Sequence, residues 1–321
     1  MNILDLLYYL LPLVIASTVP LALVALGALF SERSGVVNIA LEGIMLMGAF
    51  TGAVVIRTLE TSGLAAQWLA LIGLLSGAAV GMTFSIAHAF AAIRMKSNQI
   101  ISATALNMFA LAFVVFVART IYGTQKVTIQ DSYRIRSVPI LGDIPFIGEI
   151  LFQRAYLSTY LGAAIFIVAI IVLYRTKFGL RLRSCGENPQ AADSLGINIF
   201  RLRYAGVMIS GALAGMGGVI FVLSFAANFN ATVSGFGFLS LAVLIFGNWK
   251  PNKILLAALF FGAMRVIANS YLVIPGLNQL GFSSEIYSMI PYIATLIVLA
   301  FVSKNSAAPR AAGEPYDAGK R

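Results

Sequence analysis

Charged residues are scarce in this sequence. Asp, Glu, Lys and Arg make up 11% of the 321 residues, whereas hydrophobic residues make up 60%. Soluble domains usually carry about 25% charged and about 45–50% apolar residues. The core of a soluble protein of this length could not bury so much apolar surface. The composition therefore excludes an ordinary soluble protein and predicts an integral membrane protein.

Cysteine and histidine are almost missing as well. The single cysteine, Cys185, excludes an internal disulfide. The single histidine, His88, lies in a hydrophobic run without Cys, Asp or Glu at ligand spacing, so we predict no metal site. We interpret His88 as a packed or hydrogen-bonded residue, with a proton relay as the alternative.

Signatures of catalysis are missing too. The sequence contains no G-x-x-x-x-G-K-[ST] motif, so it binds no ATP through a P-loop of its own. It contains no Ser/His/Asp set and no paired carboxylates that would suggest hydrolysis within the membrane. We therefore predict no catalytic residues, no cofactor held by this chain and no enzymatic activity.

Long uncharged runs fill most of the sequence. A helix needs roughly 20 apolar residues to cross the hydrocarbon core, and its backbone groups must bond within the segment. The sequence thus predicts an all-α polytopic bundle of about 8–10 spans over residues 1–303. We interpret the first run as a span and not as a removable signal. The candidate spans are 3–29, 36–56, 64–93, 98–118, 156–174, 204–226, 236–249, 254–272 and 286–303.

Basic residues gather between the spans, chiefly in segment 175–203. Lys and Arg are enriched in cytoplasmic loops, so this segment is predicted to be cytoplasmic. The N-terminus and the 119–155 loop then lie outside, and the tail over 304–321 lies inside. The tail is rich in Ala, Pro and Gly and is expected to be flexible. The net charge of +10 is explained by these loops and does not indicate a nucleic-acid partner.

A short helix is predicted within segment 175–203. Asn188 suits the N-cap, Pro189 suits the first helical position, and Gly196 supplies a stop. The resulting two turns, Pro189–Leu195, are too short to be stable alone in water. The helix should therefore dock, either on anionic lipid or in a cleft of a cytoplasmic motor, as a coupling helix.

Several segments carry a resemblance to known transporters. FGLRLRSCGENPQAADSLGI resembles the coupling segment of ABC importer permeases in the branched-chain amino acid, ribose and nucleoside superfamily. Four further segments resemble its nucleoside-type, or simple-sugar, branch: LGALFSERSGVVNIALEGIMLMGAF, SNQIISATALNMFAL, GFGFLSLAVLIFGNWKP and the ending AAPRAAGEPYDAGKR. The resemblance covers nearly the whole chain.

This resemblance implies a nucleoside importer subunit in the bacterial inner membrane, surrounded by lipid. It implies as partners a second homologous permease, a tandem ABC ATPase subunit that binds ATP and Mg, and an extracytoplasmic substrate-binding (lipo)protein. It also implies which residues contact the ATPase: Gly186, Glu187, Asn188, Pro189, Ala191, Ala192 and Gly196.

Three alternatives remain open from the sequence. The same mechanism could carry simple sugars or branched-chain amino acids. A proton-coupled secondary carrier using Glu42 or His88 needs no partner, so it would leave the capped helix without a role. A scaffolding membrane protein would not explain polar residues placed inside spans.

Polar residues inside the spans are candidates for the substrate pathway. Asn38 and Glu42 are four apart, so on a helix they share one face. They either line the pathway or act as structural polar contacts between helices. Asn107, Phe236 and Phe238 are the further pathway candidates, because an amide can match a nucleoside and an aromatic ring can stack on a base.

Two further expectations concern the middle of the membrane. Arg265 is costly as an isolated charge there, so we predict an ion pair with Glu42. Ser34-Gly35 and Ser234-Gly235 each begin a similar apolar run. This echo favours two pseudo-repeated halves with broken or re-entrant segments.

Overall fold

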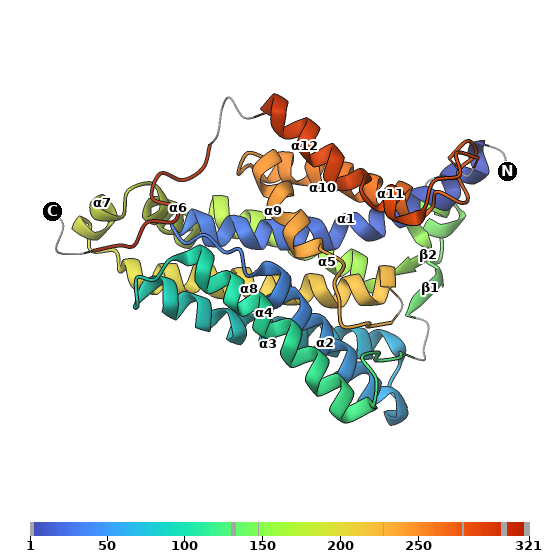
Figure 1. Ribbon diagram of the computed structural model, residues 1–321, viewed down its shortest axis with the longest axis horizontal. Helices are drawn as coiled ribbons and strands as arrows, with labels where there is room; N and C mark the ends of the chain where they lie inside the picture. Colours follow the sequence, from blue (N-terminus) through green and yellow to red (C-terminus); the bar gives the residue numbers. More distant parts are fainter. Residues whose placement is uncertain are drawn as a thin grey trace.

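The computed structural model of the chain describes residues 3–129, 133–146, 148–226, 228–277, 279–302 and 307–317. The chain folds into a series of helices with one small β-hairpin (Figure 1). In chain order they are α1 Ile3–Arg33, α2 Leu41–Leu59, η1 Glu60–Ser62, α3 Ala66–Ile93, α4 Gln99–Tyr122, β1 Arg134–Ser137, η2 Leu141–Asp143, η3 Gly148–Phe152, β2 Gln153–Tyr156, α5 Leu157–Arg175, α6 Lys177–Glu187, α7 Pro189–Ser194, α8 Ile199–Phe221, η4 Val222–Ala226, α9 Phe236–Phe246, α10 Pro251–Asn269, α11 Ser284–Ser288 and α12 Ile290–Val302.

The predicted helical bundle is confirmed. Among the described residues, seven helices are long and apolar enough to cross a membrane: α1, α2, α3, α4, α5, α8 with its η4 extension, and α10. Two predicted spans differ from this pattern. The run 236–249 forms the short α9, and the run 286–303 is divided at Met289 into α11 and α12.

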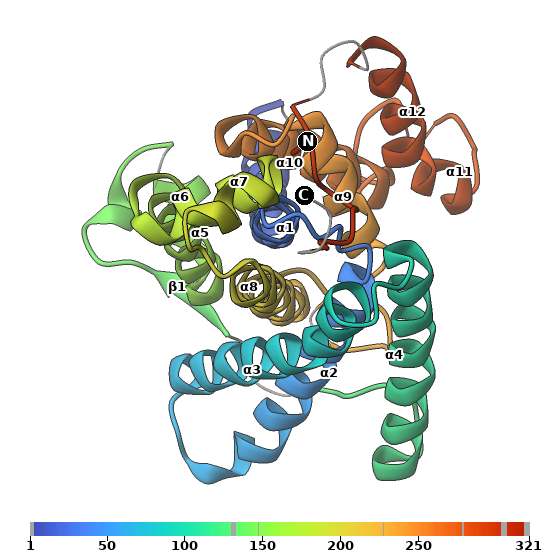
Figure 2. The same cartoon turned by 90° about the vertical axis from the view of Figure 1, so that its left-hand side faces the viewer.

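The core of the bundle is built around α1. Figure 2, which looks along the bundle from its α7 end, shows α1 surrounded by α5, α8, α9 and α10. Side chains on α1 such as Leu21, Leu26 and Leu29 are fully buried. By contrast, α4 lies on the outside, and its Phe116 is 69% exposed. Apolar side chains are stable there because the surrounding solvent is lipid.

Close glycine contacts join α3 to α8. Gly77 and Gly81 on α3 face Gly215 and Gly211 on α8 in two small-xxx-small patterns. A Cβ on Gly81 would lie 2.2 Å from the carbonyl oxygen of Gly211, and one on Gly215 would lie 2.1 Å from that of Gly77. Any side chain at these positions would force the two backbones apart, so glycine is required for this packing.

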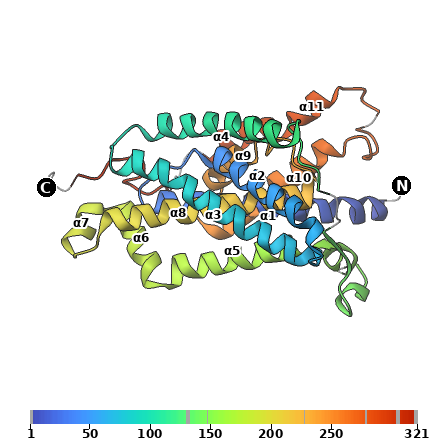
Figure 3. The same cartoon turned by 90° about the horizontal axis from the view of Figure 1, so that it is seen from below.

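The 119–155 segment includes the end of α4 and a small hairpin. Strands β1 and β2 pair antiparallel, with Ile135 opposite Ala155. An isolated bridge joins Val127 to Phe229 and thereby fixes this region to the segment before α9. Figure 3 shows the hairpin region and α7 at opposite ends of the bundle.

The C-terminal segment differs from the expected flexible tail over the residues that the structure describes. Residues 307–317 run back along the end of the bundle that carries α6 and α7 (Figures 1 and 2). Ala311 and Tyr316 are buried there. The expectation is therefore corrected for 307–317; residues 303–306 and 318–321 lie outside the described residues.

Candidate functional site

An unwound stretch, residues 34–40, separates α1 from α2 inside the bundle. Gly35 has φ +95° and ends α1 as a C′ residue. The N–H groups of Gly35 and Val36 donate to the carbonyls of Glu32 (2.9 Å) and Ser31 (3.2 Å), as in a Schellman motif. Helix α2 then begins at Leu41, so the predicted start of this span at residue 36 is wrong. The broken segment expected from the sequence is present here.

Side chains from neighbouring helices satisfy the backbone of this stretch. The N–H of Val37 donates to Gln99 Oε1 (2.7 Å), and its carbonyl lies 2.9 Å from His88 Nε2. The carbonyl of Ile39 accepts from Asn107 Nδ2 (3.0 Å). Irregular backbone at membrane depth is tolerated only where the protein provides such partners. The stretch is therefore held in place by α3 and α4.

Asn38 acts as a contact between elements. Its Nδ2 donates to Ser210 Oγ on α8 (3.0 Å), and its Oδ1 accepts from the N–H of Ala40 (3.1 Å). The residue is fully buried. Because it precedes the helix, Asn38 does not share a helical face with Glu42, and that expectation is wrong. Its geometry matches the structural alternative.

Asn107 and His88 also have structural partners. Asn107 Oδ1 accepts from the N–H of Gly43 (2.7 Å), so both ends of its amide hold the start of α2. The second ring nitrogen of His88, Nδ1, lies 3.2 Å from Ser102 Oγ. Both ring nitrogens thus have partners, which matches the hydrogen-bonded interpretation of this histidine.

Glu42 joins the beginnings of two helices. Its carboxylate accepts from the N–H groups of Gly235 (3.0 Å), Gly237 (2.7 Å) and Phe238 (3.3 Å), at the N-terminus of α9. A Cβ on Gly237 would lie 2.4 Å from the Cα of Glu42, so the two backbones touch. Because helix N-termini carry partial positive charge, a carboxylate between the starts of α2 and α9 is favourable.

Arg265 binds the same turn from α10. Its Nη2 donates to the carbonyl of Ser234 (3.0 Å), and its guanidinium lies 5.6 Å from the centre of the Phe236 ring. Arg265 and Glu42 are not among the ion pairs of the described residues, so the predicted pair is not a direct contact. The physical reason is that Glu42 takes backbone N–H donors while Arg265 takes a backbone carbonyl. The positive charge of Arg265 nevertheless acts on the Glu42 carboxyl.

The two phenylalanine candidates differ in exposure. Phe236 is fully buried and packs on Phe221, with ring centres 4.7 Å apart. Phe238 is 48% exposed. Of the predicted pathway residues, Asn38 and Phe236 are buried, Glu42 and Asn107 are half-buried, and Phe238 is exposed. Phe238 is therefore the one best placed to meet a solute or a neighbouring subunit.

A second feature lies at the same end of α1, where α7 forms as its signals predict. Asn188 Oδ1 accepts from the N–H of Ala191 (3.0 Å), Pro189 opens the helix, and Gly196 follows it with φ +76°. The helix ends at Ser194 instead of Leu195. Leu195, which directly follows α7 and lies outside the candidate membrane spans, is 81% exposed. A single exposed leucine is common on protein surfaces, so Leu195 is a candidate contact only together with the short capped helix beside it.

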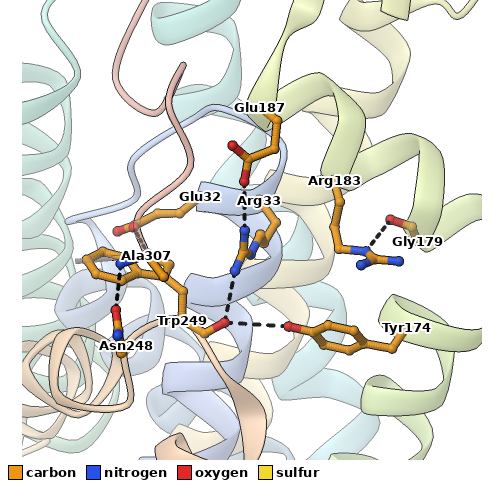
Figure 4. A network of polar contacts seen from close by, with 9 residues as sticks. All are labelled: Glu32, Arg33, Tyr174, Gly179, Arg183, Glu187, Asn248, Trp249 and Ala307. Carbon is orange, nitrogen blue, oxygen red and sulfur yellow. Dashed lines mark hydrogen bonds and ion pairs between the residues drawn. The ribbon is translucent and has the colours of Figure 1, made fainter. Parts of the chain in front are cut away.

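Helix α6, which was not predicted from the sequence, connects α7 to α1. A Cβ on Gly186 would lie 2.5 Å from the carbonyl oxygen of Arg33, so α6 rests on the end of α1. Arg33 Nη1 pairs with Glu187 (3.1 Å), and its Nη2 donates to the carbonyl of Trp249 (3.1 Å; Figure 4). The Trp249 indole donates to buried Glu32. Glu32 and Arg33, the last two residues of α1, therefore hold this junction together.

Cys185 lies beneath the same junction and is fully buried. Burial raises the pKa of its thiol from 9.0 to about 11, although the positive charge of Arg203 acts in the opposite direction. The thiol is therefore neutral at physiological pH.

Gln99, Ser210 and Trp249 were not identified from the sequence. Their partners are distant in the chain, so no local motif marks them; Trp249 could have been noticed as one of two tryptophans.

Comparison with known protein families assigns the chain to a family of membrane transport proteins. The family described as "branched-chain amino acid transport system / permease component" matches residues 11–299. The chain belongs to this family. The long helices and the capped α7 thus occur in a permease component, a multi-pass membrane protein that transports solutes.

Named relatives are similar over nearly the full length. The nucleoside ABC transporter permease protein NupC of Lactococcus lactis is 40% identical over 98% of this chain and 99% of its own. The guanosine ABC transporter permease protein NupQ of Bacillus subtilis is 42% identical over 100% of both chains. A second L. lactis protein, the nucleoside ABC transporter permease protein NupB, is 26% identical over 88% of this chain and 76% of its own.

Proposed function

We propose that this chain is the membrane subunit of an ATP-driven nucleoside importer and forms half of its translocation pathway. The observation that carries the proposal is the exposed, capped α7 with Leu195 beside it. Pro189 and Ala192 of this helix pack against the chain itself, while its other four residues are exposed and form a face that a partner can contact. The partner that fits a permease component is an ATP-hydrolysing subunit on the cytoplasmic side.

Nucleosides are proposed as the cargo because NupC and NupQ carry that cargo in their names. The electrostatics of the α2–α9 contact support an uncharged solute. Helix N-termini of broken segments attract anions, but here Glu42 already occupies the N-terminus of α9. The site therefore offers little to the carboxylate of an amino acid.

Four partners follow from this assignment. The second permease would resemble this chain, as NupB and NupC resemble it within one organism. A tandem ABC ATPase would bind ATP and Mg, and an extracytoplasmic (lipo)protein would deliver the solute. The bacterial inner membrane supplies the lipid around the bundle. Residues 307–317 would then lie on the cytoplasmic side with α7.

The coupling route runs through described contacts. Closure of the ATPase dimer would push on α7, and α6 would pass the movement to Arg33 through Glu187. Arg33 ends α1 directly before the unwound stretch 34–40. That stretch leads to Glu42 and the start of α9, so a shift of α6 reaches the middle of the bundle.

Uptake of radiolabelled nucleosides into cells with and without this gene tests the proposal. We expect gene-dependent uptake that stops on ATP depletion and persists under an uncoupler that leaves ATP intact. Unlabelled nucleosides should compete, whereas simple sugars and branched-chain amino acids should not. Uptake that collapses with the proton gradient while ATP is preserved would contradict the proposal.

A further inference from the structure

Residues 307–317 bind to the junctions between helices at the α7 end of the bundle. The N–H of Ala311 donates to the carbonyl of Gly186 (2.9 Å), next to α7. The N–H of Gly313 donates to the carbonyl of Gly35 (3.2 Å), at the end of α1. The segment therefore ties the end of α6, next to α7, to the unwound stretch through two backbone hydrogen bonds.

Side chains extend these contacts to three more junctions. Tyr316 packs on Phe200 near the start of α8, with ring centres 5.7 Å apart. Asp317 pairs with Lys96 between α3 and α4 (3.4 Å). The N–H of Ala307 donates to Asn248 Oδ1, between α9 and α10 (2.6 Å). A segment with so many specific partners is part of the folded structure of this end.

The segment and α7 share a polar recess of about 360 Å³. The start of α7 forms one wall, and the C-terminal segment forms the other; the charged residues of the lining are Glu187, Arg203, Arg310, Glu314 and Asp317. Gln190, Glu314 and Pro315 are exposed on its rim. Any partner that enters the recess must touch both walls.

We propose that residues 310–317 and α7 together form one docking surface for the ATP-hydrolysing subunit. The proposal rests on the proposed function and extends it to the C-terminal segment. The lining carries two arginines and three acidic residues, so it has no excess of positive charge. An anionic lipid surface requires such an excess, whereas the polar side chains of a protein can pair with both signs.

Photo-crosslinking tests this surface in the assembled complex. A photoreactive amino acid replaces Glu314 in one variant and Gln190 in a second; both positions are exposed, so folding is preserved. A third variant carries it at Ser62, an exposed residue between α2 and α3. Each complex with the second permease and the ATPase is purified, irradiated and resolved on a denaturing gel.

We expect the Glu314 and Gln190 variants to give a band shifted by the mass of one ATPase subunit, and the Ser62 variant to give none. A shifted band from Gln190 alone would overturn the C-terminal surface and leave the proposed function standing. Shifted bands from neither position would overturn both. A band from Glu314 alone would overturn the shared surface.

Discussion

At the scale of single residues, Glu42 links two segments that are far apart in the sequence. It belongs to the first turn of α2 and takes three backbone N–H groups from the N-terminus of α9. These two segments are far apart in the sequence, and each follows a stretch of irregular backbone. One carboxylate therefore fixes the place where both interrupted segments meet.

Replacing Glu42 with Gln should destabilise the protein. The change keeps the shape but removes the charge that strengthens three hydrogen bonds, and hydrogen bonds to charged groups contribute about 1.5–3 kcal/mol each in favourable cases. We expect the Tm in detergent to fall by several degrees. Glu149→Gln, on an exposed carboxyl in η3, is the matched control. Equal Tm values for both variants would show that Glu42 does not hold α9.

Cys185 should react slowly with maleimide in the folded protein. The thiol is fully buried, and with its pKa raised to about 11 the thiolate is rare at pH 7.5. Labelling should become rapid after denaturation in SDS. Cys185→Ser supplies the blank, and Ser62→Cys in that background supplies an exposed thiol. Fast labelling of folded Cys185 would contradict the packing of α6.

The same raised pKa gives a pH dependence. The folded state holds the thiol proton more tightly than the unfolded state, whose pKa is 9.0. The resulting stabilisation is complete below pH 9 and is lost as pH rises toward about 11. The Tm should therefore fall more steeply over that interval in the natural protein than in Cys185→Ser.

At the scale of elements, the sequence predicts the features that depend on neighbouring residues, such as helices and their caps. It does not predict features that depend on contacts between distant segments. Hydropathy places seven long helices, and the caps of α7 are correct because each signal acts within a few residues. Hydropathy averages over a window, so it cannot show that residues 36–40 are unwound. That unwinding depends on Gln99, His88 and Asn107, which come from other helices.

The exposed end of α7 is expected to contact the ATPase through Leu195. Leu195→Ser should weaken association with the ATPase by roughly ten- to a hundredfold, because burying a leucine side chain contributes roughly 1.5–3 kcal/mol. Co-purification of the ATPase from detergent-solubilised membranes measures the effect. Leu64→Ser, at a 45% exposed leucine before α3, is the control. Undiminished co-purification with Leu195→Ser would exclude Leu195 from the contact.

At the scale of the whole molecule, one end is built from segments far apart in the chain. Arg33 meets Glu187 and Trp249, while residues 307–317 reach the ends of α1, α6 and α8. Composition predicts the membrane bundle, but these long-range contacts arise only when the helices are packed. In the proposed mechanism, these contacts carry a force applied at α7 to the start of α9.

Reconstitution tests most directly whether ATP drives the uptake of nucleosides through this chain. The chain, its second permease, the ATPase and the solute-binding protein are placed in proteoliposomes, and uptake of a radiolabelled nucleoside is measured. The ATPase sites face the solution that contains either ATP or ADP, and a proton gradient is imposed in separate samples. Our account predicts uptake with ATP and none with ADP, whether or not the gradient is present. Uptake with ADP driven by the proton gradient would contradict it.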